Sequence, residues 1–120
     1  MSDNIKTIRE LKETVYKFVE ARDWQKFHNP KDLSMYIAIE SAELMEKFLW
    51  MSTEASKQEL NNNRQEIENE LADVLITSIS FANISGIDIF KIVEEKLALN
   101  NKKYSLEKSK ELNDKYTKYQ

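Results

Sequence analysis

The sequence contains no cysteine, and among its 120 residues it has one histidine, one glycine and one proline. The absence of cysteine excludes a disulfide framework, a thiolate metal site and a cysteine nucleophile. One histidine does not suffice for a zinc site that is built on several imidazoles. The scarcity of glycine and proline argues against a sheet protein, which needs many tight turns. We therefore predict an all-α fold of long helices joined by few loops.

The chain also lacks a strong excess of charge of either sign. It has 18 basic and 21 acidic residues, for a net charge of −3. This balance does not match the basic footprint of a duplex-binding domain, so we expect no nucleic-acid partner. No segment reaches membrane-spanning length, and the N-terminus lacks the apolar stretch of a signal peptide. We therefore expect a cytoplasmic protein with no membrane partner.

Apolar residues recur at helical spacing along most of the chain. The predicted helices cover residues 3–21, 32–51, 65–85 and 88–103, with a short helix and a loop between the second and the third. The residues expected to bound them are Ser2 or Asp3, Asp32 or Ser34, Gly86 and Asp88. We expect a four-helix bundle-like subunit as a single domain over 1–105, and a polar tail over 106–120 that is partly helical or frayed.

Two pairs of acidic residues interrupt faces that should pack. Glu40 and Glu43 are three residues apart on the second predicted helix, and Glu70 and Asp73 repeat this spacing on the third. Residues three apart share a helix face, and large apolar side chains occupy the same sector in both helices. Carboxylates that converge on such a face repel one another and lose hydration, so they either raise one another's pKa values or need a positive counter-charge.

A divalent cation would supply that charge. An all-oxygen ligand set suits Mg²⁺, with Mn²⁺ as a substitute, better than zinc or iron. A helical di-iron site usually requires Glu-x-x-His on two helices, and His28 does not lie in that position. The alternative interpretation is that both acidic pairs are ordinary solvated helix positions. Each pair alone supports that interpretation, whereas two pairs on successive helices favour a metal site.

The ordered set of motifs resembles the MazG-like all-alpha nucleoside triphosphate pyrophosphohydrolases. Beyond the two acidic pairs, the segments ARDWQKFHNPKDL, KFLW, ELADVLI, GIDIF and KLALNNKKY resemble the dCTP pyrophosphatase branch. The resemblance covers about residues 5 to 105. It implies a Mg²⁺-dependent enzyme that hydrolyses a nucleoside triphosphate to the monophosphate and pyrophosphate, through attack of an activated water on the α-phosphorus.

The resemblance also implies roles for individual residues. Glu40, Glu43, Glu70 and Asp73 would be the metal ligands, and Glu40 or Glu43 would in addition orient or deprotonate the attacking water. The residues implied in phosphate or sugar binding are Lys96, Asn100, Lys103 and Tyr104. The residues implied in the base pocket are Trp24, His28, Trp50 and Thr77.

Thr77 departs from the pattern of the branch, which often has a tyrosine there. A smaller side chain would widen the pocket or relax base choice, so Thr77 bears on the choice of base and not on the triphosphate chemistry. The expected substrate is dCTP or a related pyrimidine deoxynucleoside triphosphate. Two other functions fit the same sequence: a non-catalytic helical interaction module, and a phosphohydrolase of the same fold acting on another pyrophosphate-linked metabolite such as phosphoribosyl-ATP.

The apolar faces of the predicted helices are wider than one bundle seam requires. Hydrophobic residues make up 41% of the chain, and a domain of this size has a high surface-to-volume ratio. Related enzymes are dimers or tetramers with sites near subunit interfaces. We therefore expect a homodimer or homotetramer.

Overall fold

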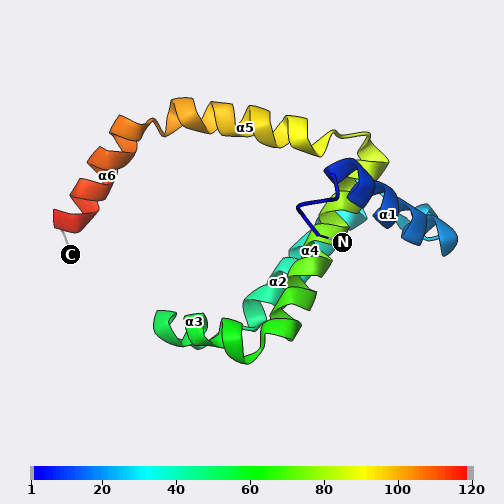
Figure 1. Cartoon of the computed structure of the whole chain (residues 1–120), viewed down its shortest axis with the longest axis horizontal. Helices are drawn as coiled ribbons and strands as arrows, with labels where there is room; N and C mark the ends of the chain where they lie inside the picture. The colour runs from blue at the N-terminus through cyan, green and yellow to red at the C-terminus, as the bar shows by residue number, and fades with distance from the viewer. Residues whose placement is uncertain (1, 119–120) are drawn as a thin grey trace. The chain divides into compact units, whose positions relative to one another are not determined.

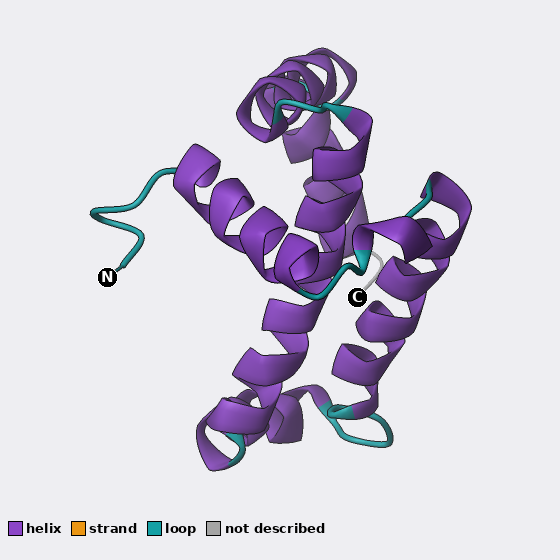
Figure 2. Cartoon of the chain, turned by 90° about the vertical axis from the view of Figure 1, so that its right-hand side faces the viewer, coloured by secondary structure: helices purple, strands orange, loops and turns teal. Residues whose placement is uncertain are grey.

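The computed structural model describes residues 2–118 of the chain, and the side chains of residues 2–113. Within that range the protein is all-helical, with no strand, as the scarcity of glycine and proline predicted (Figures 1 and 2). The helices are α1 (Ile8–Ala21), α2 (Pro30–Glu46), α3 (Thr53–Asn62), α4 (Arg64–Ser85), α5 (Ile89–Lys103) and α6 (Leu106–Lys118), with a 3₁₀ turn η1 (Gln25–Phe27). No single helix in the described range is both long and apolar enough to cross a membrane.

The chain divides into two compact units, Met1–Ile87 and Asp88–Gln120. In the first unit, α2 and α4 form the main helix–helix interface, and α1 packs against α4. The second unit consists of α5 and α6. The extent of the predicted domain, to residue 105, stays a prediction.

Short polar side chains determine where most of the helices begin. Asn29, Ser52 and Asp88 each accept a hydrogen bond from the backbone N–H three residues later, at about the distance expected of an N-cap. Gly86 ends α4 with φ of 65°, the left-handed conformation that glycine adopts without strain. The predicted roles of Gly86 and Asp88 are therefore confirmed.

The predicted start of the first helix is wrong. The helix begins at Ile8 rather than near Asp3, because the hydroxyl of Thr7 accepts a hydrogen bond from the N–H of Glu10 at 3.1 Å. Thr7 and Glu10 have the spacing of a capping box, and this local signal was missed. Ile5, assigned to the helix by its apolar spacing, precedes it and is exposed.

Both predicted ends of the second helix also need correction. It is capped by Asn29, with Pro30 in the first turn, where its missing N–H is harmless. The helix ends at Glu46 rather than at Met51, and residues 47–50 form turns. Trp50 lies in this turn with φ of 62°, a left-handed conformation that is unusual for a bulky residue.

The apolar core of the chain is small. The buried hydrophobic residues are Val15, Val19, Leu33, Ile67, Ile79 and Ala82. They lie on α1, α2 and α4, where Leu33 is the most deeply buried. Asn83 strengthens this packing, because its amide donates to the carbonyl of Lys12 at 3.1 Å and joins α4 to α1. The small core fixes the α2–α4 pair, which carries both acidic pairs.

Candidate metal centre

The four acidic residues of the two predicted pairs converge between α2 and α4. Each of Glu40, Glu43, Glu70 and Asp73 offers a carboxylate oxygen, and these oxygens all lie within 4.8 Å of one another. The convergence follows from the helix geometry, because each pair lies on one face and α2 packs along α4. Leu33, on the same face of α2 as Glu40, is fully buried and holds that face against its neighbours.

Two of the carboxylate oxygens have no partner. Glu40 and Glu70 are partly buried, and the Oε2 atom of each is inaccessible to solvent without a hydrogen-bond partner. A buried oxygen that makes no hydrogen bond is destabilising, since it loses water and gains nothing in return. These oxygens are therefore free to bind a cation, and the all-oxygen donor set fits a hard divalent ion.

The acids also perturb one another electrostatically. The pKa of Glu43 is raised, chiefly by a hydrogen bond with Glu40 and then by the charge of that residue. Burial raises the pKa of Glu70, and the charge of Glu43 raises it further. Both shifts have the sign expected of carboxylates that share a site without enough positive charge. A bound cation would reverse this effect by favouring the ionised forms.

The residues predicted to bind phosphate or sugar lie in the second unit, on and just after α5. Lys96, Asn100 and Lys103 are spaced four and then three residues apart, so they share one face of the helix. Tyr104 follows the helix, and the ammonium group of Lys103 lies 5.3 Å from the centre of its ring. Their approach to the four acids stays a prediction.

The residues predicted to bind the base all lie in the first unit. Trp24 packs edge-on against Phe18, with ring centres 5.7 Å apart, and remains 45% exposed. Trp50 is 99% exposed in the single chain. The hydroxyl of Thr77 donates within α4, to the carbonyls of Asp73 and Val74. The pocket that His28 lines does not include the other three side chains, and their common role at a base stays a prediction.

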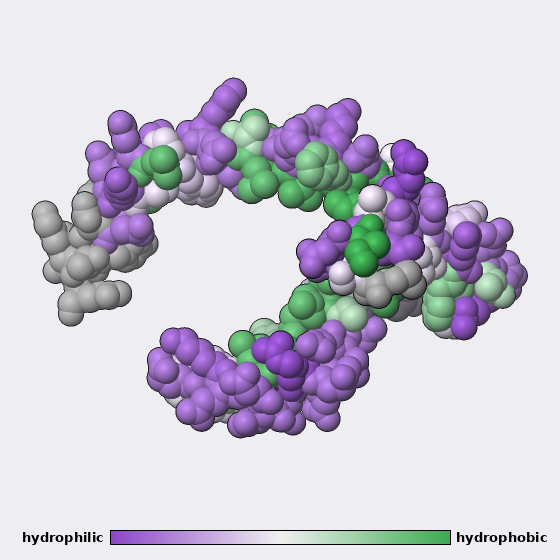
Figure 3. Space-filling model, in the orientation of Figure 1, coloured by the Kyte–Doolittle hydropathy of each residue, from purple (hydrophilic) through white to green (hydrophobic). Residues whose placement is uncertain are grey.

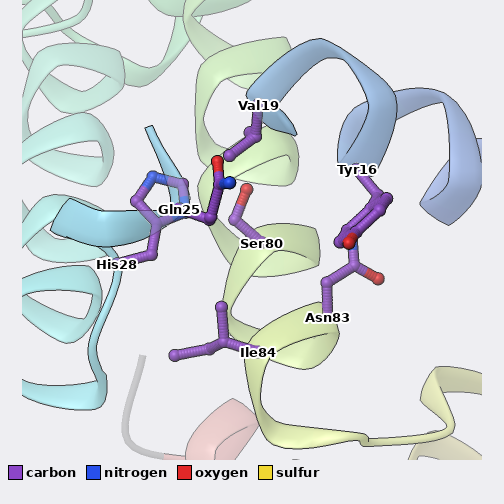
Figure 4. Close-up of a pocket in the computed structure, with 7 residues that line it drawn as sticks. All are labelled: Tyr16, Val19, Gln25, His28, Ser80, Asn83 and Ile84. Atoms are coloured by element: carbon purple, nitrogen blue, oxygen red, sulfur yellow. The ribbon is translucent and has the colours of Figure 1, made fainter. Parts of the chain in front are cut away.

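His28 lies in a small pocket of about 60 Å³ between α1, α4 and the linker of residues 22–29, which joins α1 to α2 (Figure 4). Gln25 and Ser80 also line it, and neither was singled out from the sequence. Ser80 is buried and lies seven residues after Asp73, so both occupy one face of α4, about 10 Å apart along its axis. The helical period of α4 was the signal that could have identified Ser80.

Comparison with known proteins decides the family. A model of the MazG-like family matches residues 35–118, which include all four acids.

The chain belongs to the MazG-like family.

This MazG-like chain is similar over 113 residues to dCTP pyrophosphatase 1 from mouse and from human, at 32% and 29% identity. The match covers 92% of the chain and 66% of each relative, so the chain spans just under two thirds of their length. It also resembles the crystal structure of a pyrophosphatase from Archaeoglobus fulgidus, with a TM-score of 0.80 and 33% identity. That match covers 88% of this chain and 98% of the archaeal chain. The family and the all-helical fold expected from the sequence motifs are thus confirmed.

Proposed function

We propose that this MazG-like protein is a divalent-metal-dependent nucleoside triphosphate pyrophosphohydrolase. The observation that carries the proposal is the convergence of four carboxylates, two of which present buried oxygens without partners. The names of the dCTP pyrophosphatase 1 relatives and of the archaeal pyrophosphatase support the same reaction class. The products would be a nucleoside monophosphate and pyrophosphate.

Glu40, Glu43, Glu70 and Asp73 would hold the metal. When bound, Mg²⁺ or Mn²⁺ supplies charge neutralisation at the phosphates and lowers the pKa of water at the site. The chain's own contribution is to fix the carboxylates on two packed helices, so that little reorganisation is needed when the substrate arrives. Glu43 or Glu40 would orient the attacking water or accept its proton, because both belong to the carboxylate set at which that water would be activated.

The bond that breaks joins the α-phosphorus to the oxygen bridging it to the β-phosphorus. Oxygen from water bonds to the α-phosphorus, its proton passes to a carboxylate, and pyrophosphate leaves with the bridging oxygen. Lys96 and Lys103 would complement the charge of the phosphates, and Asn100 would donate to phosphate or sugar. Tyr104 would border the same region.

The base subsite would lie beside α4, on the C-terminal side of the four acids. Thr77 and Ser80 follow Asp73 on one face of this helix, and Ser80 lines the pocket that contains His28. His28 would therefore meet the edge of the base, with Trp24 and Trp50 as stacking surfaces. The hydroxyl of Thr77 is engaged by the backbone, so Thr77 would contribute space rather than a hydrogen bond. Pyrimidine deoxynucleotides, with dCTP first among them, are the proposed substrates.

We further propose that the active form is a homodimer or homotetramer. Large apolar side chains of α5 are at least half exposed, among them Phe90, Val93 and Leu97. These three residues share one stripe of the helix by their spacing. Figure 3 shows apolar surface along this helix. An apolar stripe of this kind is typical of a helix that packs against another chain.

The test is a panel of the canonical NTPs and dNTPs, each incubated with the protein and Mg²⁺. We expect monophosphate and pyrophosphate, with pyrimidine deoxynucleotides turned over fastest. Release of orthophosphate, or no turnover of any substrate, would reject the proposed reaction. Turnover of phosphoribosyl-ATP with none of the nucleoside triphosphates would assign the chain to the other phosphohydrolase chemistry.

A further inference from the structure

The cationic side chain of Lys47 borders the four carboxylates on the α2–α4 face. Lys47 is the C-cap of α2 and keeps helical dihedral angles, with φ of −64° and ψ of −19°. It follows Glu43 by four residues, so it lies one turn further along the same face. Its Nζ atom donates to Oε2 of Glu66 at 3.3 Å. Glu66 in turn precedes Glu70 by one turn on α4.

These contacts place charged side chains opposite one another along α2 and α4. Lys47 pairs with Glu66, and one turn away from that pair Glu43 and Glu70 have carboxylate oxygens within 4.8 Å of each other. Residue numbers rise along α2 as they fall along α4, so the two helices run antiparallel at this face. Among the ion pairs of the described residues, Lys47–Glu66 is the one that joins two different helices. The other pairs join residues three or four apart in sequence.

The field of Lys47 extends beyond its ion pair. Glu43, one turn before Lys47, and Glu70, one turn after Glu66, belong to the carboxylate set whose oxygens lie within 4.8 Å of one another, so the charge of Lys47 acts on that set as well. The side chain of Lys47 is 30% exposed, whereas the lysines of the other ion pairs are 47–67% exposed. Water therefore screens the charge of Lys47 less than it screens theirs. A fixed positive charge one turn away from four converging carboxylates opposes the entry of a cation and attracts an anion.

We propose that Lys47, held by Glu66, is a positioning residue that weakens the affinity of the four-carboxylate site for a free divalent cation and favours a cation that arrives with phosphate. The inference rests on the proposed function, because it assumes that the four acids hold a divalent metal. Lys47 offsets part of their negative charge when no cation is bound. When the metal arrives with a polyphosphate, the same charge adds to the attraction for the phosphate oxygens.

The experiment measures binding of Mg²⁺ alone, and of pyrophosphate in saturating Mg²⁺, by calorimetry. Lys47→Met should bind free Mg²⁺ about two- to fivefold more tightly than the wild type, since a repelling charge is lost. The same variant should bind pyrophosphate with Mg²⁺ more weakly, by a similar factor. Opposite changes in the two affinities are the signature of the proposed role, because simple loss of packing would weaken both.

Two further variants make the result interpretable. Lys47→Arg keeps the charge and should restore both affinities to near the wild-type values. Lys57→Met is the matched control, because it removes one positive charge and an ion pair of the same 3.3 Å length, to Glu54 on α3. It should change neither affinity. The helical CD signal of each variant verifies folding. If Lys47→Met does not fold, Glu66→Gln provides the test. This variant should weaken Mg²⁺ binding, because it releases Lys47 toward the acids.

The outcomes separate this inference from the proposed function. If the wild type binds Mg²⁺ and Glu70→Gln does not, the metal site stands. If Lys47→Met then equals Lys57→Met in both affinities, or loses both together, the role of Lys47 is refuted. If Glu70→Gln binds Mg²⁺ as the wild type does, the metal site itself is refuted.

Discussion

The α2–α4 face and helix α5 both carry residues that the family resemblance assigns to one reaction, yet they differ in how they are held. On the α2–α4 face, four carboxylates, of which those of Glu40 and Glu70 are partly buried, are held by the packing of two helices within one unit. On α5, Lys96 and Lys103 are exposed on a helix whose apolar stripe is exposed as well. The four acids thus form a half that packing preorganises within one unit, whereas the basic residues of α5 lie on a helix whose apolar stripe remains exposed.

The largest effect should come from the preorganised half. Glu70→Gln keeps the size of the side chain but removes a charge from the four-carboxylate set, so turnover should fall about a hundredfold or more. The rate of pyrophosphate release from dCTP in the presence of Mg²⁺ measures this loss of turnover. Glu68→Gln is the matched control, because Glu68 lies on α4 in an exposed pair with Arg64. A Glu70→Gln protein with unchanged rates would contradict the assignment.

The second effect tests the helix α5. Replacing both Lys96 and Lys103 by alanine should raise the KM for the triphosphate about tenfold, since two charge-assisted phosphate contacts are lost. Binding of free Mg²⁺ should stay the same. Lys102→Ala serves as the control on the same helix, because this residue lies off the face shared by Lys96 and Lys103. Equal KM values for the double variant and the control would show that these α5 residues do not bind the triphosphate.

The third effect concerns the apolar stripe of α5. Leu97→Glu places a charge on the stripe formed by Phe90, Val93 and Leu97, so it should dissociate the proposed homodimer or homotetramer. Sedimentation velocity of the variant at micromolar concentration measures this. Glu95→Gln, at an exposed position off the stripe, should leave the assembly intact. A wild-type protein that sediments as a monomer would reject the proposed assembly.

The smallest effect is a pH dependence of stability in the absence of metal. The pKa values of Glu43 and Glu70 are raised in the folded chain, so both groups bind protons more tightly there than in the unfolded chain. Their contribution to stability is present below the ordinary glutamate pKa and is lost as the pH rises through the raised values. The metal-free Tm should therefore fall across this window, and Glu70→Gln should reduce the fall.

Addition of Mg²⁺ should oppose that loss, because the cation binds the ionised acids and the folded state only. A metal-free Tm that rises across the same pH window, equally in the wild type and in Glu70→Gln, would contradict the arrangement of the acids.

Local patterns were sufficient to predict much of the fold and the acidic set. The i, i+3 spacing of each acidic pair determines that its members share a face, and Gly86 and Asp88 bound their helices by short-range geometry. The start of α1 was missed because the apolar spacing placed Ile5 in the helix, whereas the hydrogen bond from the N–H of Glu10 to the hydroxyl of Thr7 begins the helix after Thr7.

Other features depend on contacts between segments far apart in the sequence. The ion pair of Lys47 with Glu66 spans 19 positions, and the pocket of His28 requires α4 to lie beside the linker. Neither follows from spacing along one helix. The exposure of Trp50 is likewise set by the turn after α2, which ends the helix earlier than its apolar pattern indicates.

The central claim is that the acids of α2 and α4 hold a divalent cation. Titration of the protein with Mn²⁺, followed by electron paramagnetic resonance, tests it without reference to any substrate. We expect saturable Mn²⁺ binding that Mg²⁺ displaces. The Glu68→Gln variant should retain this binding, and a Glu40→Gln, Glu70→Gln double variant should lose it. Mn²⁺ binding of equal strength in the wild type and in that double variant would contradict it.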